Sequence, residues 1–175
     1  MQAMRGWNLF SLTAVAAAFL LGSCGGGKTG NDEAEIRKLI ADGAAFAEQK
    51  KIGDLLGLTT EAFRADPGDK DRQEVRGTLF MAFRHYGSFT IAYPTPSVEV
   101  GAGKQQAEAK LSFLVMKEDA RVPGLKELSN RPDQWIEKTR GIADLYYLEL
   151  SLKEEGEKWR VERSRIRGTR GFEGD

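Results

Sequence analysis

Apolar residues recur every three to four positions through the first half of the chain, and this spacing predicts three helices. The first begins at Asp32, a residue type that caps helices, with Glu35 three residues later as in a capping box. Its apolar stripe consists of Ile36, Leu39, Ile40, Gly43, Ala44 and Ala47. A short second helix covers residues 52–58, and the turn sequence Asp66-Pro67-Gly68-Asp69 follows it. A third helix ends at Gly87 and carries on one face Val75, Leu79, Ala82, Phe83 and Tyr86.

After Gly87 the apolar spacing changes from the period of a helix to that of a strand. Residues 89–93 alternate, residues 98–100 resume the alternation after two prolines, and the turn Gly101-Ala102-Gly103 predicts a hairpin whose returning strand covers residues 107–116. A polar insertion, residues 117–140, precedes two long strands, residues 142–153 and 158–166, that are joined by a tight turn. We therefore expect an α+β domain in which three N-terminal helices pack on a curved antiparallel sheet.

The N-terminus has the order of a signal peptide. The positively charged Arg5 precedes an apolar run from Trp7 to Leu21, and the run ends at Leu21-Gly22-Ser23-Cys24. That run spans about 15 residues, whereas a membrane-spanning helix needs roughly 20, so a cleaved leader is the better interpretation. The four closing residues resemble the lipobox of bacterial lipoproteins, which implies cleavage before Cys24 and attachment of diacylglycerol to its thiol. An ordinary signal peptide or an uncleaved helix is the alternative interpretation.

The lipobox resemblance implies a signal peptide (1–23). The glycine-rich sequence after it predicts a flexible tether (24–31), and the apolar pattern predicts a folded domain (32–168) followed by a tail (169–175). Because Gly25 rather than aspartate follows the cysteine, the resemblance implies the outer membrane of the cell envelope, facing the periplasm. Residues 22–29 also match the phosphate-loop pattern G-x-x-x-x-G-K-[ST]. A working phosphate loop follows a buried strand and opens a helix, and cleavage before Cys24 would divide this one, so we expect no nucleotide site.

Charge and composition narrow the classes of function. The chain has 26 basic and 26 acidic residues, and removal of the leader with Arg5 leaves 25 against 26. A near-neutral protein has no general attraction to nucleic acid, which we therefore exclude as a partner. One histidine, a single cysteine and scattered carboxylates supply no metal-ligand set, and we expect no metal or cofactor. His85 is more simply a surface residue at a helix end than a pocket acid or base, so no catalytic residue is assigned.

Several local motifs add a resemblance to this pattern. They are Leu55-Leu56 in the short helix, a third helix that leads directly into Ser88-Phe89-Thr90-Ile91, and the closing sequence Gly156-Glu157-Lys158-Trp159-Arg160-Val161. In this order they resemble the nuclear transport factor 2-like (NTF2-like) superfamily, also called SnoaL-like. The resemblance implies a sheet that wraps around a helix into a cone with an apolar cavity. The proline-broken start of the sheet and the insertion at residues 117–140 depart from that pattern.

Two groups of residues are candidates for binding. Aromatic residues that could line the cavity, or simply fill the core, are Phe83, Tyr86, Phe113, Tyr146 and Trp159. Of these, Trp159 alternates with Val161 and is expected on the inward face of the last strand. The second group alternates on the same strand and comprises Arg163, Arg165 and Arg167. It could face an anionic surface, or pair across strands with Glu149, Glu154 and Glu162.

The superfamily that the motifs resemble contains both enzymes and binding modules, so the fold does not decide the function. We expect a non-catalytic, lipid-anchored protein of the bacterial envelope that binds a small apolar ligand or a protein partner. The alternative is a small enzyme of the isomerase, dehydratase or cyclase type that uses a buried carboxylate. An Asp, Glu or His side chain that points into an apolar cavity would distinguish the second function from the first.

Overall fold

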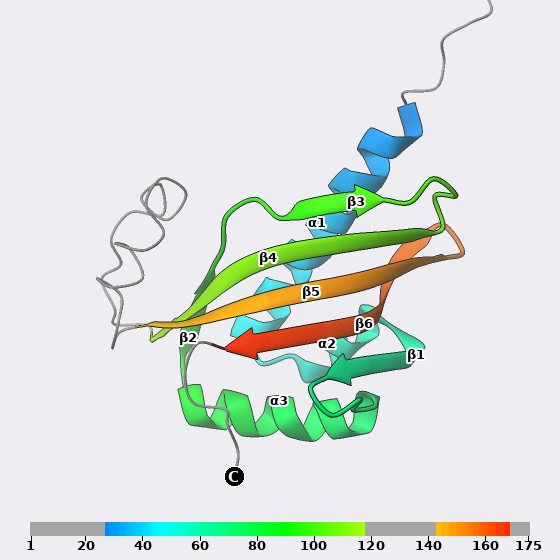
Figure 1. Ribbon diagram of the computed structural model, residues 1–175. Helices are drawn as coiled ribbons and strands as arrows, with labels where there is room; N and C mark the ends of the chain where they lie inside the picture. The colour runs from blue at the N-terminus through cyan, green and yellow to red at the C-terminus, as the bar shows by residue number, and fades with distance from the viewer. Residues whose placement is uncertain (1–26, 118–142, 169–175) are drawn as a thin grey trace, which may run out of the picture.

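The computed structural model describes residues 27–117 and 143–168 (Figure 1). The predicted signal peptide, Cys24, nearly all of the insertion and the tail lie outside these ranges. The described elements confirm the α+β class. They are α1 (Gly27–Glu48), α2 (Ile52–Gly57), β1 (Thr59–Asp66), α3 (Arg72–Tyr86), β2 (Phe89–Ala92), β3 (Ser97–Val100), β4 (Gln106–Lys117), β5 (Ala143–Glu155) and β6 (Lys158–Gly168).

The strands form one open sheet in the order β1-β6-β5-β4-β2, and β3 pairs with β4 beside β2. Strands β2 and β3 therefore share one partner: Ala92 lies opposite Leu114 near the end of β4, and Val98 lies opposite Ala109 nearer its start. Pro94 lies in the break between the two short strands. The predicted antiparallel meander from β3 to β6 is confirmed.

Strand β1 corrects two expectations. It lies between α2 and α3, where the sequence pattern predicted helices in succession, and it pairs with β6 in parallel, so the sheet is mixed. The alternation of β1 is poor because Glu61 and Ala62 are both exposed and Phe63 is its one buried large apolar residue. Its register with β6 is also irregular between Thr59 and Arg64. Such a strand is specified by its distant partner more than by its own pattern.

The helices cover one face of the sheet. Figure 1 shows α1 crossing behind the strands and α3 running along the β1 side. Helix α1 begins at Gly27, ahead of the predicted N-cap Asp32, so residues 27–31 of the predicted tether are helical. Helix α3 ends at Gly87, as predicted, and it begins with a capping box between Asp71 and Glu74 that was not predicted. No helix in residues 27–117 or 143–168 is both long and apolar enough to cross a bilayer.

The main core lies between α1 and the inner face of the sheet. Ile36 and Ile40 of α1 belong to the same buried cluster as Leu152, Trp159 and Val161. The exposed fraction of Trp159 is 5%, which confirms its predicted inward position. The first half of α1 is therefore packed against the strand ends that meet at the turn between β5 and β6.

A β-bulge divides β6 into two halves of different phase. Val161 lies opposite Leu152 of β5, and Arg163 lies opposite the next residue back, Ser151, so Glu162 is the extra residue. Strict alternation from Trp159 would have turned the following arginines inward. Because of the bulge, Ser164 faces inward instead, and the side chains of the basic group point to the outer face.

Candidate functional site

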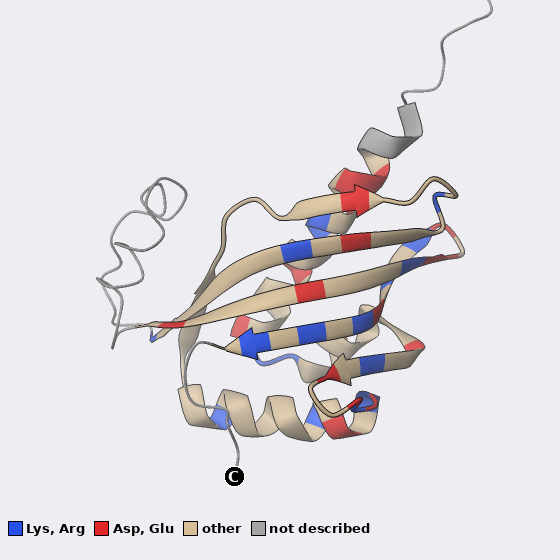
Figure 2. Cartoon of the chain, viewed as in Figure 1, with Lys and Arg blue, Asp and Glu red and all other residues tan. Residues whose placement is uncertain are grey.

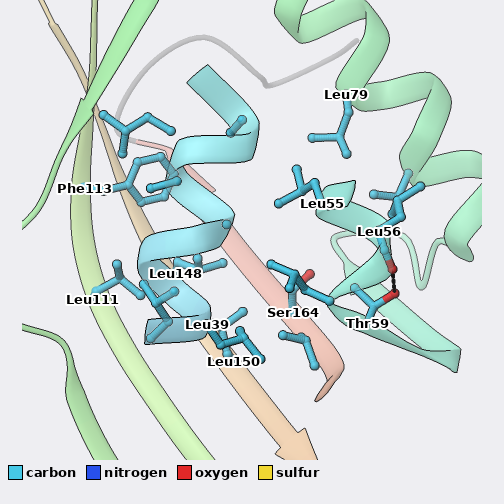
Figure 3. A pocket seen from close by; sticks show the side chains of 18 of the residues that line it. Leu39, Leu55, Leu56, Thr59, Leu79, Leu111, Phe113, Leu148, Leu150 and Ser164 are labelled. Carbon is cyan, nitrogen blue, oxygen red and sulfur yellow. Dashed lines mark hydrogen bonds between the residues drawn. The ribbon is translucent and has the colours of Figure 1, made fainter. Parts of the chain in front are cut away.

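A pocket of about 260 Å³ lies between the helices and the inner face of the sheet (Figure 3). Helix α1, helix α2 and strands β4 and β5 supply most of its wall. The residues from these four elements are Leu39, Ile40, Gly43, Ala44, Ala47, Leu55, Leu56, Leu111, Phe113, Leu148 and Leu150. A concave, largely apolar wall of this kind is typical of small-molecule sites.

The pocket exists because the apolar stripe of α1 decreases in size along the helix. Its first half carries Ile36 and Ile40, which fill the core, whereas its second half presents Gly43, Ala44 and Ala47 to the same interior. A Cβ atom built on Gly43 would lie 3.5 Å from a Leu58 methyl, in ordinary van der Waals contact. Small side chains on α1 therefore leave space where larger ones would complete the packing.

Helix α2 forms one wall and is held by hydrogen bonds to its last carbonyl groups. The Leu56 carbonyl accepts from Thr59 Oγ1 at 2.8 Å and from Arg72 Nη2 at 3.0 Å. The Gly57 carbonyl accepts from the Arg160 guanidinium. These bonds satisfy groups that a helix end leaves free, and they tie α2 to α3 and β6.

The polar groups of the pocket wall are few and uncharged. Thr59, Tyr93 and Ser164 line the pocket, and the described part of the wall contains no Asp, Glu, Lys, Arg or His. The Thr59 hydroxyl is already engaged, because it donates to the Leu56 carbonyl. An occupant of this pocket would therefore meet a hydrophobic wall with isolated hydroxyl groups.

Two carboxylates near the pocket are not lining residues, and each accepts a hydrogen bond from the protein. Glu48 Oε1 accepts from the backbone N–H of Ile91 at 2.6 Å. Burial, and secondarily the negative charge of Glu48, raise the pKa of Tyr93. Asp144 Oδ2 accepts from the Tyr86 hydroxyl at 2.6 Å. Neither carboxylate is a lining residue of the pocket.

Asp144 belongs to a chain of hydroxyl groups between α3 and β5. The hydroxyl oxygens of Tyr86 and Tyr146 lie 2.5 Å apart. The single hydroxyl hydrogen of Tyr86 is used in the hydrogen bond to Asp144. Tyr146 is therefore the donor in the bond between the two tyrosine hydroxyls. Burial first, and the bond to Asp144 second, raise the pKa of Tyr86 well above its usual range. The neighbouring His85 is exposed, as expected.

The predicted aromatic residues occupy different places. Phe113 lines the pocket and stacks on Tyr146 with ring centroids 5.3 Å apart. Phe83, Tyr86 and Tyr146 belong to an adjoining core cluster, and Trp159 lies in the main core. Most of the wall consists of aliphatic residues that were not singled out. The signal that could have identified them is the decrease in side-chain size along the stripe of α1.

The basic group of β6 lies beside acidic positions of the neighbouring strands β5 and β1 (Figure 2), and every member has an acidic partner on the outer face. Arg163 binds Asp66 and Asp69, each at 2.9 Å. Arg167 binds Glu149 at 2.8 Å, and Arg165 lies 3.6 Å from the same carboxylate. Of the three expected partners, Glu149 pairs with this group, whereas Glu154 and Glu162 make no ion pair with it within the described residues. The two aspartates come from the end of β1 and the turn after it. An anionic surface for this group stays a prediction. Within the described ranges, no three His, Cys, Asp or Glu residues are grouped so as to hold a metal ion.

No protein-family model matches the sequence, and no curated protein matches it. Solved structures do match. An NTF2-like protein with a cystatin-like fold from Novosphingobium aromaticivorans is 16% identical, with a TM-score of 0.59 over 83% of this chain and 87% of that chain. An NTF2-like protein of unknown function from Pseudomonas putida is 13% identical, with a TM-score of 0.61 over 82% and 91%. A protein from N. aromaticivorans assigned provisionally as a scytalone dehydratase is 11% identical, with a TM-score of 0.59 over 81% and 87%.

These comparisons show the fold. The chain shares the fold of these NTF2-like proteins, a mixed α+β arrangement with N-terminal helices packed on an open sheet. At such identities the functions of the similar proteins do not transfer to this chain, because one fold hosts many functions. The function must therefore be argued from the pocket itself.

Proposed function

We propose that this protein is a lipid-anchored binding protein of the bacterial envelope that holds a small apolar ligand in the pocket between α1, α2 and the sheet. The observation that carries the proposal is the pocket wall, which is apolar except for hydroxyl groups. Transfer of apolar surface from water into such a wall is favourable by roughly 25 cal/mol per Å². The resemblance of Leu21-Gly22-Ser23-Cys24 to a lipobox supports the anchored location.

An acid–base enzyme has less support. Such chemistry needs a proton donor or acceptor within reach of the bound molecule. Asp144 and Glu48 each accept a hydrogen bond from a protein donor, and neither lines the pocket. The described wall offers hydroxyl groups, which are weak acids and bases at neutral pH.

The proposal can be tested by filling the pocket. Ala44 lines it, and a phenylalanine at this position would occupy the space that a ligand needs. We expect the purified chain to bind the fluorescent apolar probe N-phenylnaphthylamine, and Ala44→Phe to weaken that binding at least about tenfold, the effect of roughly 1.4 kcal/mol. Thermal unfolding of the variant should stay cooperative.

The matched control is Ala41→Phe, which adds the same side chain on the exposed side of the same helix. It should bind the probe as the wild type does. Equal probe binding by the Ala44→Phe variant and the wild type, with both proteins folded, would show that the pocket is not the binding site.

A further inference from the structure

The Ser164 hydroxyl is available to an occupant of the pocket. Ser164 lies opposite Leu150 in the register of β5 and β6, and its side chain extends from β6 into the pocket, toward the side formed by α2 and Thr59 (Figure 3). Within the described part of the chain, this hydroxyl makes no hydrogen bond. It therefore keeps one donor and its acceptor positions for a ligand. Thr59 can only accept, because its proton is used on the Leu56 carbonyl.

The bulge at Glu162 determines which residue occupies this place. In a regular strand that keeps Trp159 and Val161 inward, the inward position after them belongs to Arg163. The extra residue shifts the phase, so the pocket receives a neutral hydroxyl and the outer face receives the guanidinium groups. The sequence of β6 thus places the cations of this strand away from the pocket.

We propose that the pocket selects neutral apolar molecules that carry one hydroxyl or carbonyl oxygen, and that Ser164 makes the hydrogen bond that selects them. This inference rests on the proposed function of the pocket. A pure hydrocarbon would cover Ser164 and leave a buried hydroxyl without a partner, which is unfavourable. A ligand carboxylate would lose its hydration on entering a pocket whose described wall has no cation to pair with it. The free-energy cost of that transfer is larger still.

The test compares three probes of one ring system, namely naphthalene, naphthol and naphthoate, in equilibrium binding to the purified full-length chain at neutral pH. We expect the wild type to bind naphthol about 2 to 10 times more tightly than naphthalene, the ratio that one net hydrogen bond supplies, and naphthoate most weakly. Ser164→Ala should reduce naphthol to the affinity of naphthalene. It should not weaken the binding of naphthalene, and it should tighten that binding by up to about tenfold, because naphthalene no longer covers a hydroxyl that lacks a partner.

Two further variants identify the group responsible. Ser151→Ala removes an exposed hydroxyl on the outer face of β5, and all three affinities should stay as in the wild type. Tyr93→Phe removes the other lining hydroxyl that has no hydrogen-bond partner within residues 27–117 and 143–168, and the preference for naphthol should survive. Persistence of the preference in Ser164→Ala, or its loss in Tyr93→Phe alone, would overturn the assignment to Ser164.

The wild-type result separates this inference from the function on which it rests. If naphthalene binds but naphthol has no advantage, or if naphthoate binds best, the proposed selectivity is wrong and the apolar pocket stands. If none of the three probes binds, both proposals fail.

Discussion

The hydroxyl of Tyr86, in the last turn of α3, donates to the carboxylate of Asp144 at the start of β5, across 58 positions of the sequence. Tyr146 extends the chain by donating to Tyr86. Asp144 lies on the inner face of the sheet because it shares a face with Tyr146 and Phe113. The bond therefore connects the end of a helix to the sheet beside the pocket.

Loss of this bond should destabilise the domain. Tyr86→Phe removes the donor and leaves a half-buried carboxylate without it, so we expect a decrease of about 1 to 3 kcal/mol in the free energy of unfolding. Denaturant titration measures it. Tyr147→Phe is the control, because Tyr147 is 44% exposed on the opposite face of the same strand. Its change should stay within about 0.5 kcal/mol.

The same cluster predicts a dependence of stability on alkaline pH. The pKa of Tyr86 is raised in the folded chain, so the folded state keeps this phenolic proton at pH values where the unfolded state loses it. The resulting stabilisation is complete below about pH 10 and decreases as the pH rises above that value. Between about pH 9 and pH 11, the unfolding free energy of Tyr86→Phe should decrease less steeply than that of the wild type. Parallel curves would contradict this explanation.

Trp159 provides a test of the core. Its side chain is 5% exposed, and Trp159→Ala should lower the unfolding free energy by about 3 to 5 kcal/mol. Phe80→Ala is a suitable comparison because Phe80 is 57% exposed on α3, and its loss should stay within about 0.5 kcal/mol. Similar losses of unfolding free energy for the two variants would mean that Trp159 does not face the core.

Two single-residue deletions test the bulge. Deletion of Glu162 alone would leave a regular strand in which Val161 and Ser164 both still face inward. This shortened chain should therefore unfold cooperatively with a modest loss of stability. Deletion of Ser164 alone would turn Arg165 and Arg167 toward the core. We expect no cooperative unfolding of this chain, because unpaired charges would be buried. Circular dichroism during thermal unfolding distinguishes the two. If the first deletion is as damaging as the second, Glu162 is not the extra residue.

The anchor has its own test. Cys24→Ser should abolish lipid attachment, because serine has no thiolate to accept the diacylglyceryl group. The wild-type protein should partition into the detergent phase and the variant into water, since buried acyl chains contribute about 0.8 kcal/mol per methylene. Detergent-phase separation of the two proteins measures this, and equal partitioning would contradict lipidation.

The spacing of apolar residues was sufficient to predict those helices and strands that are specified by their own residues and their neighbours in sequence. The stripe of α3 and its end at Gly87 were predicted, as were the hairpins from β3 to β6. Strand β1 was missed because its pairing with β6 comes from the far end of the chain, and Phe63 alone marks its inward face. The inward Trp159 and the outward arginines were both predicted, and only the register shift at Glu162 reconciles them.

The pocket was harder to predict than the fold. Aromatic residues are conspicuous in a sequence, but Phe83, Tyr146 and Trp159 are buried core residues because large rings fill space, and only Phe113 lines the pocket. A cavity is created by side chains that are too small to meet, here Gly43, Ala44 and Ala47, and their effect depends on what lies opposite. Ser164 could not be identified without the bulge that turns it inward.

The bond between Glu48 and the Ile91 N–H also bears on self-association. Strand β2 pairs with β4 on one side, and a free edge with unused N–H groups invites another chain to add a strand. Here the Ile91 donor is occupied by a carboxylate of the same molecule, and Pro94 and Pro96, which have no N–H, come shortly after. Strand-by-strand aggregation would have to break the Glu48 bond before it could begin, so this edge is protected by the protein's own side chain.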